Sequence, residues 1–72
     1  MTYSADYYLS SKINWTKTGD AEYPYSAHSE GEKLIVRLND FPAEPMYTLL
    51  VSESVLCDFD DWPKPWSRPA QA

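Results

Sequence analysis

The sequence has very little of the residues from which catalytic and metal sites are usually built. Its 72 residues include one cysteine, Cys57, one histidine, His28, and two glycines. A single cysteine cannot form an internal disulfide, and two isolated glycines cannot form a phosphate-binding loop. These absences exclude an internally disulfide-stapled fold and a glycine-rich nucleotide site. We expect no bound cofactor.

Long hydrophobic runs are missing as well. Aliphatic runs such as Leu49-Leu50-Val51 stop after three residues, whereas a membrane helix needs about 20. The first residues do not join a basic start to an apolar stretch, so we expect no signal peptide. Together with the unpaired cysteine, these features predict a soluble protein of the cytoplasm, where thiols stay reduced.

Positive charge is missing from a long internal stretch. The net charge is −5 at pH 7, and no lysine or arginine occurs between Leu38 and Pro63. A negative surface disfavours nucleic acids and anionic membranes and attracts basic partners, so we expect a basic protein partner. The alternative interpretation is that the acidic residues only keep a small domain soluble. The acidic residues of this stretch are Asp40, Glu44, Glu53, Asp58, Asp60 and Asp61.

Aromatic residues are abundant and compensate for a small supply of aliphatic ones. The chain has three tryptophans, six tyrosines and two phenylalanines. Each of these side chains can bury about 150–250 Å². A chain of this length forms one domain at most. We predict a single small β domain with an aromatic core over residues 1–66, followed by a flexible C-terminal tail at residues 67–72.

Alternation of apolar and polar residues predicts short β-strands through most of the chain. Both faces of segment 46–51 are apolar, which is typical of a central strand. Pro24 has no backbone donor, so it favours an edge position for segment 23–26. Turn residues separate the segments. The candidate strands are residues 12–16, 23–26, 33–39, 46–51 and 55–59, with turns or loops at 18–20, 29–32, 40–45 and 52–54.

The N-terminal segment is ambiguous. Ala5, Tyr8 and Leu9 recur at helical spacing after Ser4, a residue type that caps helices, but the Tyr-Tyr-Leu sequence also suits a strand. The whole pattern predicts an all-β or β-dominated fold. It is a small antiparallel meander of four or five short strands, either open or curled into a barrel-like sheet. No stretch of the sequence carries a family signature.

The C-terminal segment is the most distinctive part of the sequence. Pro63 and Pro65 separate Trp62 from Trp66 and favour an extended, polyproline-type chain. One interpretation is that the segment folds back over the core, with Trp62 docked and Trp66 more exposed. The other is a recognition segment, since tryptophan and stiff proline-rich chains are common at binding sites. The candidate partner-binding residues are Asp58, Asp60, Asp61, Trp62 and Trp66.

No complete catalytic motif is present. Val55, Cys57 and Phe59 alternate along one predicted strand, so we expect Cys57 to be buried on their shared face and not to act as a nucleophile. His28 precedes a turn, a position typical of a solvated side chain. The sequence therefore predicts a protein without catalytic residues.

The acidic run that begins at Asp58 is the one candidate for a metal site. A calcium-binding loop needs glycine at its sixth position and glutamate at its twelfth. Counted from Asp58, those positions hold Pro63 and Pro69. The loop pattern fails, and we expect no metal ligands.

These observations favour a non-enzymatic, acidic protein-binding module. Its most concrete form is an inhibitor or immunity-type protein that blocks a basic partner, with charge guiding the encounter and aromatic residues making the contact. The alternative is a structural subunit that forms homo-oligomers through an exposed edge strand. A monomer and a homodimer are both compatible with the sequence.

Overall fold

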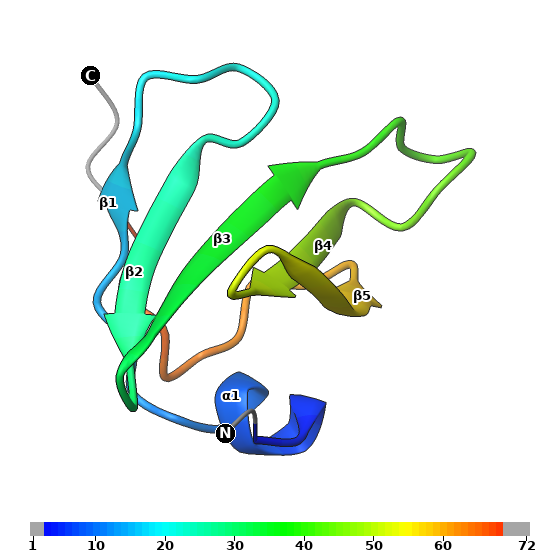
Figure 1. Cartoon of the computed structure of the whole chain (residues 1–72). Helices are drawn as coiled ribbons and strands as arrows, with labels where there is room; N and C mark the ends of the chain where they lie inside the picture. Colours follow the sequence, from blue (N-terminus) through cyan, green and yellow to red (C-terminus); the bar gives the residue numbers. More distant parts are fainter. Residues whose placement is uncertain (1–2, 69–72) are drawn as a thin grey trace.

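The computed structural model describes residues 3–68, which form one antiparallel sheet and one short helix. The elements are α1 (Ala5–Leu9), β1 (Thr16–Lys17), β2 (Tyr25–Ser29), β3 (Glu32–Leu38), β4 (Tyr47–Val51) and β5 (Ser54–Phe59). Figure 1 shows the strands crossing the sheet in the order of the sequence. The predicted β-dominated meander is confirmed. The sheet stays open instead of closing into a barrel, with β1 and β5 at its edges.

Two-residue turns join β2 to β3 and β4 to β5. Glu30 (φ 52°) and Gly31 (φ 77°) form the first turn, and Ser52 (φ 49°) and Glu53 (φ 71°) form the second. Positive φ at both central residues gives a turn the twist that its flanking strands require. Both turns lie where the sequence predicts them, although the second places two non-glycine residues in left-handed backbone.

The N-terminal segment forms the predicted helix and not the alternative strand. The Tyr7 N–H donates to Ser4 Oγ (3.3 Å), which caps the first turn. The Tyr7 hydroxyl donates to Glu30, and this hydrogen bond is the main reason that the pKa of Tyr7 is raised. The bond ties α1 to the β2–β3 turn. No helix within residues 3–68 is long and apolar enough to cross a membrane.

The central position predicted for residues 46–51 is confirmed, because β4 pairs with β3 on one side and β5 on the other. The edge position predicted for residues 23–26 is wrong. Pro24 lies just before β2, and the strand itself pairs with β1 and β3. Since the ladder begins after the proline, its missing donor costs no strand hydrogen bond.

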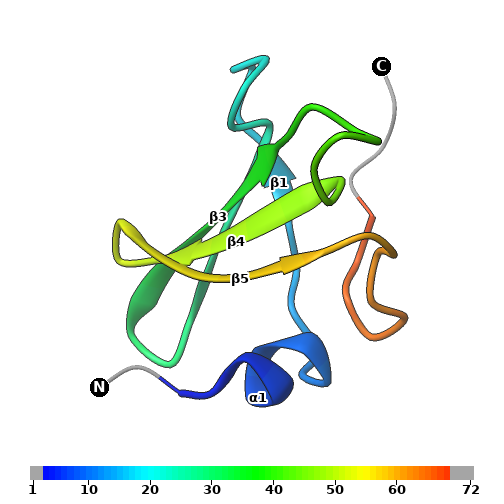
Figure 2. The same cartoon turned by 90° about the vertical axis from the view of Figure 1, so that its right-hand side faces the viewer.

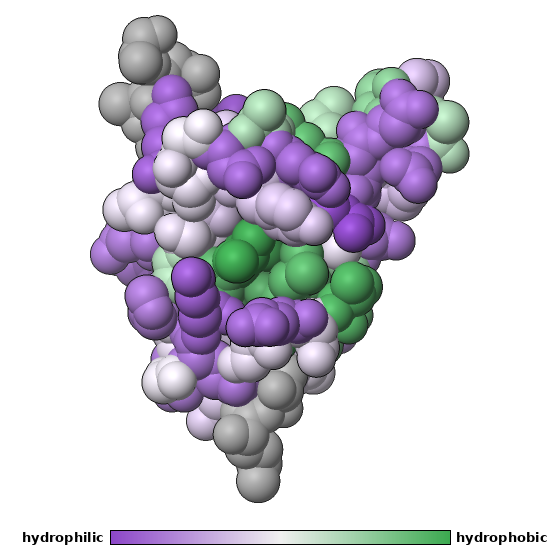
Figure 3. Space-filling view, turned by 45° about the horizontal axis from the view of Figure 1, so that its top comes forward, coloured by the Kyte–Doolittle hydropathy of each residue, from purple (hydrophilic) through white to green (hydrophobic). Residues whose placement is uncertain are grey.

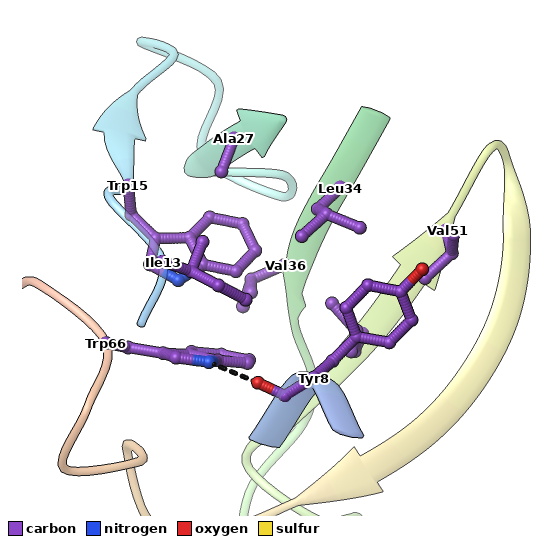
Figure 4. Packing of buried hydrophobic residues seen from close by; sticks show 9 residues of the cluster. Tyr8, Ile13, Trp15, Ala27, Leu34, Val36, Val51 and Trp66 are labelled. Atoms are coloured by element: carbon purple, nitrogen blue, oxygen red, sulfur yellow. Dashed lines mark hydrogen bonds between the residues drawn. The ribbon is translucent and has the colours of Figure 1, made fainter. Parts of the chain in front are cut away.

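The core lies on one face of the sheet, and the two ends of the chain cover it. Figure 4 shows Tyr8 and Trp66 packed over the inward side chains of the strands, with the Trp66 indole N–H donating to the Tyr8 carbonyl oxygen (2.7 Å). The backbone next to Trp66 is bound as well, because the Ser67 N–H donates to the Ile13 carbonyl oxygen (2.8 Å). The buried core residues are Tyr8, Ile13, Trp15, Ala27, Leu34, Val36, Leu49, Val51 and Trp66.

The predicted docking order of the two tail tryptophans is wrong. Trp66 is 4% exposed and belongs to the core, whereas Trp62 is half-buried. The chain does not continue in extended form past Pro63, because the Trp66 N–H donates to the Pro63 carbonyl oxygen (3.1 Å). This turn brings the second indole back under the sheet. Ser67, assigned to the tail by sequence, is hydrogen bonded to the domain, and residues 69–72 lie outside the described residues.

The shared face predicted for Val55, Cys57 and Phe59 is wrong for Val55. The β4–β5 register shifts between Leu49 and Leu50, where β5 carries one extra residue. A one-residue shift moves a side chain to the other face. Val55 is therefore 60% exposed on the outer face, while Cys57 and Phe59 pack half-buried against the core.

Candidate functional site

The β3–β4 loop, residues 39–46, is held in one shape by hydrogen bonds at its base and across its turn. The Asn39 N–H donates to the Met46 carbonyl oxygen (3.0 Å), and the Asn39 side-chain amide donates to the Pro45 carbonyl oxygen (2.9 Å). Asp40 and Glu44 are bonded to each other twice, through Glu44 N–H to Asp40 carbonyl (2.9 Å) and Asp40 N–H to Glu44 Oε1 (3.0 Å). These hydrogen bonds make the loop an ordered extension of the β3–β4 hairpin.

This loop presents an aromatic side chain to solvent. Phe41, at its turn, is 53% exposed, and Leu38, where β3 enters the loop, is 42% exposed. Large aromatic side chains that remain exposed on a structured loop are typical anchors of protein interfaces. Asp40 and Glu44 flank Phe41 in the sequence and are both exposed.

The end of β5 joins the loop. Asp60 Oδ1 accepts the Met46 N–H (2.9 Å), which fastens the chain after β5 to the base of the loop. Two acidic segments that are well separated in the sequence thus meet at one end of the sheet. We call this region the acidic end; it comprises the exposed residues Leu38, Asp40, Phe41, Glu44, Asp58, Asp60 and Asp61.

Next to the acidic end, the outer face of the sheet carries a polar network. Thr48 is fully buried there, and its hydroxyl donates to Asp58 Oδ1 (2.6 Å) and accepts from Asn39 Nδ2 (2.7 Å). Arg37 Nε donates to Asn39 Oδ1 (2.9 Å). The hydrogen bond from Thr48 holds Asp58, one of the predicted partner-binding residues, against β4, and the residue remains exposed.

The rest of the outer face is partly apolar. Ile35 pairs with Leu50, and Leu50 with Val55, in one row across β3, β4 and β5. A cavity of about 480 Å³ opens beside this row, lined by Lys33, Ile35, Ser52 and Glu53. Figure 3 shows apolar residues in a hollow of the surface, with hydrophilic residues around it. The lining of the 480 Å³ cavity carries one positive side chain, Lys33, and one negative side chain, Glu53, so the charge of the cavity favours no particular ligand.

The fold places the predicted site residues in different environments. Asp58, Asp60 and Asp61 are exposed and belong to the acidic end. Trp62 lies between the rings of Tyr25 (5.1 Å between centroids) and Tyr47 (5.6 Å). The Arg68 guanidinium covers its ring at 5.5 Å. Trp66 is buried against the rings of Trp15, Phe59 and Trp62, so its position is that of a core residue.

The two residues that could serve as nucleophile or base lie on different faces. His28 is exposed and pairs with Lys33 on the outer face, whereas Cys57 is half-buried on the core face. Burial raises the pKa of the Cys57 thiol, and the neighbouring Asp58 raises it further. A raised pKa disfavours the reactive thiolate. Within residues 3–68, no group of His, Cys, Asp and Glu side chains is placed to hold a metal ion.

Sequence reasoning missed Leu38 and Phe41. Leu38 continues the alternation of Leu34 and Val36 along segment 33–39, a pattern that indicates a buried side chain, yet it is exposed. Phe41 was assigned to a loop without a role. The available signal was its position, because a phenylalanine between Asp40 and Pro42 in a predicted loop has no strand to bury it. The comparisons with known proteins find no similarity: no family model, curated protein or solved structure matches the chain.

Proposed function

We propose that the protein is a non-catalytic binding module that takes a basic protein partner at its acidic end. The observation that carries this proposal is Phe41, a half-exposed aromatic side chain on a hydrogen-bonded loop that is flanked by carboxylates. An apolar anchor beside exposed carboxylates resembles the usual organisation of a protein interface, with an apolar centre and a polar rim.

The hydrogen bonds that order the loop support this function. Association must overcome the loss of conformational freedom of the contacting groups, and a loop that is already ordered loses less. Asn39 bonds the base of the loop and Asp40 with Glu44 bond its turn, so Phe41 is presented before any partner arrives.

Charge supports the choice of a basic partner. Asp40, Glu44, Asp58, Asp60 and Asp61 gather at one end of the sheet. Arg37, a basic side chain on the outer face, is bonded to Asn39. Such a surface accelerates encounters with a positive protein and repels nucleic acid and anionic lipid. An inhibitor or immunity-type role toward a basic enzyme is one form that this activity can take.

Homo-oligomerisation through β5 is the second candidate. It is supported by the position of β5 at the sheet edge. The charge of the edge opposes it, because two copies paired antiparallel along the whole of β5 would set Asp60 of each chain opposite Glu53 of the other. Like charges across a strand pair are destabilising. Light scattering decides between the two: the proposal expects a monomer at micromolar concentration, and a dimer supports the alternative.

The test of the proposal is capture of proteins from a lysate of the source cells by matched variants. Phe41→Ala removes the anchor without changing charge, and Glu44→Gln removes charge but keeps the acceptor for the Asp40 N–H. The matched control is Lys17→Gln, at the opposite edge strand β1. We expect a basic protein that binds wild type and the control, and that is lost with both site variants.

The captured complex should also respond to salt. Exposed charges act over about 10 Å at 0.1 M ionic strength, so the association rate should fall as salt is added. An acidic partner, or a partner captured equally by all variants, would contradict the proposal.

A further inference from the structure

The two edge strands of the sheet, β1 and β5, differ in the length of strand that they present to a partner. β1 has two residues, and the chain just before it is already bridged to the C-terminal segment through Ile13 and Trp66. β5 has six residues and one neighbour, β4. Figure 2 looks onto this edge and shows β5 in front, with no other element drawn across it.

The backbone groups that β5 turns outward follow from the bonds of β4. The Asn39 N–H bonds the Met46 carbonyl, and the Ser52 N–H bonds the Lys33 carbonyl. In an antiparallel ladder the bonds of a central strand alternate between its neighbours, so Thr48 and Leu50 bond β3. Their partners on β5 are Asp58 and Val55. These two residues therefore direct their N–H and C=O groups away from β4, to the open edge.

The side chains at these two positions point to the same face. Val55 is 60% exposed and Asp58 is exposed, and both lie on the outer face because of the extra residue at the bulge. An incoming strand would find an apolar side chain and a carboxylate on this face. Glu53 before β5 and Asp60 after it, both exposed, extend the negative charge beyond the ends of the strand.

We infer that the β5 edge binds an extended, basic segment of the partner as a sixth strand of the sheet. This inference rests on the proposed function and gives its binding mode. Main-chain hydrogen bonds at Val55 and Asp58 supply affinity. Cross-strand pairs supply selectivity, with an apolar residue beside Val55 and a lysine or arginine beside Asp58. The occupant is not a second copy, since antiparallel pairing along the whole of β5 would set Glu53 of each chain opposite Asp60 of the other, and like charges across a strand pair are destabilising.

The experiment uses a defined probe, the eight-residue peptide Thr-Val-Thr-Lys-Thr-Val-Thr-Lys, added to the isotope-labelled full chain. Residues two apart share one face of a strand, so valine and lysine follow each other on a single face of this peptide, as Val55 and Asp58 do on β5. We expect shifts and slowed hydrogen exchange at the Val55 and Asp58 amides. Two control peptides separate the causes: the same peptide N-methylated at its valines and lysines loses the N–H groups that would pair with Val55 and Asp58, and the same peptide with glutamate in place of lysine reverses the charge. Each ladder bond that is lost should weaken binding of the N-methylated peptide about tenfold.

A pair of protein variants adds an independent measurement. Val55→Pro removes the outward N–H and keeps the bonds to β4, as proline is tolerated at such edge positions. It should weaken the lysine peptide about tenfold as well. Val55→Thr, which keeps the N–H, is the matched control. If the proline variant fails to fold, the N-methylated peptide on wild type still decides the question.

The outcomes separate the inference from the proposed function. If the N-methylated peptide binds as tightly and shifts the amides of Asp40 and Phe41 instead, strand addition is wrong and basic-partner binding stands. If the glutamate peptide pairs with β5 as well as the lysine peptide does, strand addition stands and the selection of basic partners is wrong. If the lysine peptide does not bind at all, the inference is overturned.

Discussion

The core face of the sheet is covered by segments near both ends of the chain, whereas the outer face is formed by the side chains of the strands themselves. On the core face, Tyr8 from α1 and Trp66 from the C-terminal segment close over Leu34, Val36 and Leu49. On the outer face, Thr48 is buried by polar neighbours, with Asp58 and Asn39 as its partners. The core face derives its stability from aromatic packing, and the outer face holds its order through hydrogen bonds.

The difference shows how so short a chain provides both a core and a surface for binding. Small domains bury a limited fraction of their surface. Here both covering segments, α1 and the C-terminal segment, lie on the same face of the sheet. The rings of Trp15, Trp62 and Trp66 meet there, with centroids 4.8–6.0 Å apart. The other side keeps its strands accessible, including the β5 edge and the acidic end.

The largest expected effect is on the covered face. Trp66→Ala should lower the free energy of unfolding by about 3–5 kcal/mol, because it removes a buried indole and the hydrogen bond to the Tyr8 carbonyl. Trp62→Ala should cost less, since this ring is half-buried. Urea denaturation of the two variants measures both values. A larger loss in Trp62→Ala than in Trp66→Ala would show that the core is centred on the other indole.

The outer face should respond more weakly and through polarity. Thr48→Val keeps the branched shape but removes the hydroxyl, which leaves Asp58 and the Asn39 amide without this partner. We expect a loss of about 1–2 kcal/mol, the net contribution of such hydrogen bonds, because Asp58 is exposed to water and the Asn39 amide keeps the Pro45 carbonyl as an acceptor. Thr48→Ser retains the hydroxyl and should lose less. If Thr48→Val were as stable as wild type in urea, the hydrogen bonds of Thr48 would not contribute to the free energy of unfolding.

The sequence predicts the strands because alternation is a local property. Segment 33–39 shows its buried side through Leu34 and Val36, and segment 46–51 shows its central place through two apolar faces. The helix start at Ser4 is equally local, since the cap and the helical spacing lie within a few residues.

What the sequence could not show depends on contacts between distant segments. The place of Val55 is set by a bulge in the β4–β5 register, and no residue in β5 marks it. The burial of Trp66 depends on the turn at Pro63 and on a carbonyl in α1, which is 58 residues away. The acidic end depends on the bond from Met46 to Asp60. Its charge follows from the sequence, whereas the position of Phe41 in a predicted loop indicates an exposed ring but not that the two acidic segments meet beside it.

A smaller effect is expected where the outer face ends, at the Ser52–Glu53 turn. Glu53 has φ 71°, a conformation that costs an L residue about 1 kcal/mol relative to glycine. Glu53→Gly should therefore raise the free energy of unfolding by up to about 1 kcal/mol. The control is Gly31→Ala in the other turn, where an added Cβ meets nothing within 4 Å and φ is 77°. That variant should be destabilised by backbone strain alone, and equal thermal midpoints for all three proteins would contradict this account.

The smallest effect concerns Cys57, at the margin of the covered face. Burial is the main cause that raises the pKa of its thiol above the ordinary value of 9.0, followed by Asp58 and Asp6. A raised folded-state pKa means that the neutral thiol stabilises the fold below the unfolded pKa, and that this contribution disappears as pH rises through the folded value. Stability should therefore decline slightly in alkaline solution above pH 9, and the decline should vanish in Cys57→Ala.

Alkylation by iodoacetamide at pH 8 should be slower in the folded protein than in urea, because less thiolate is present and the sulfur is partly covered. Equal rates in both states would show that β5 leaves the sulfur open to solvent and that this part of the face is not covered at all.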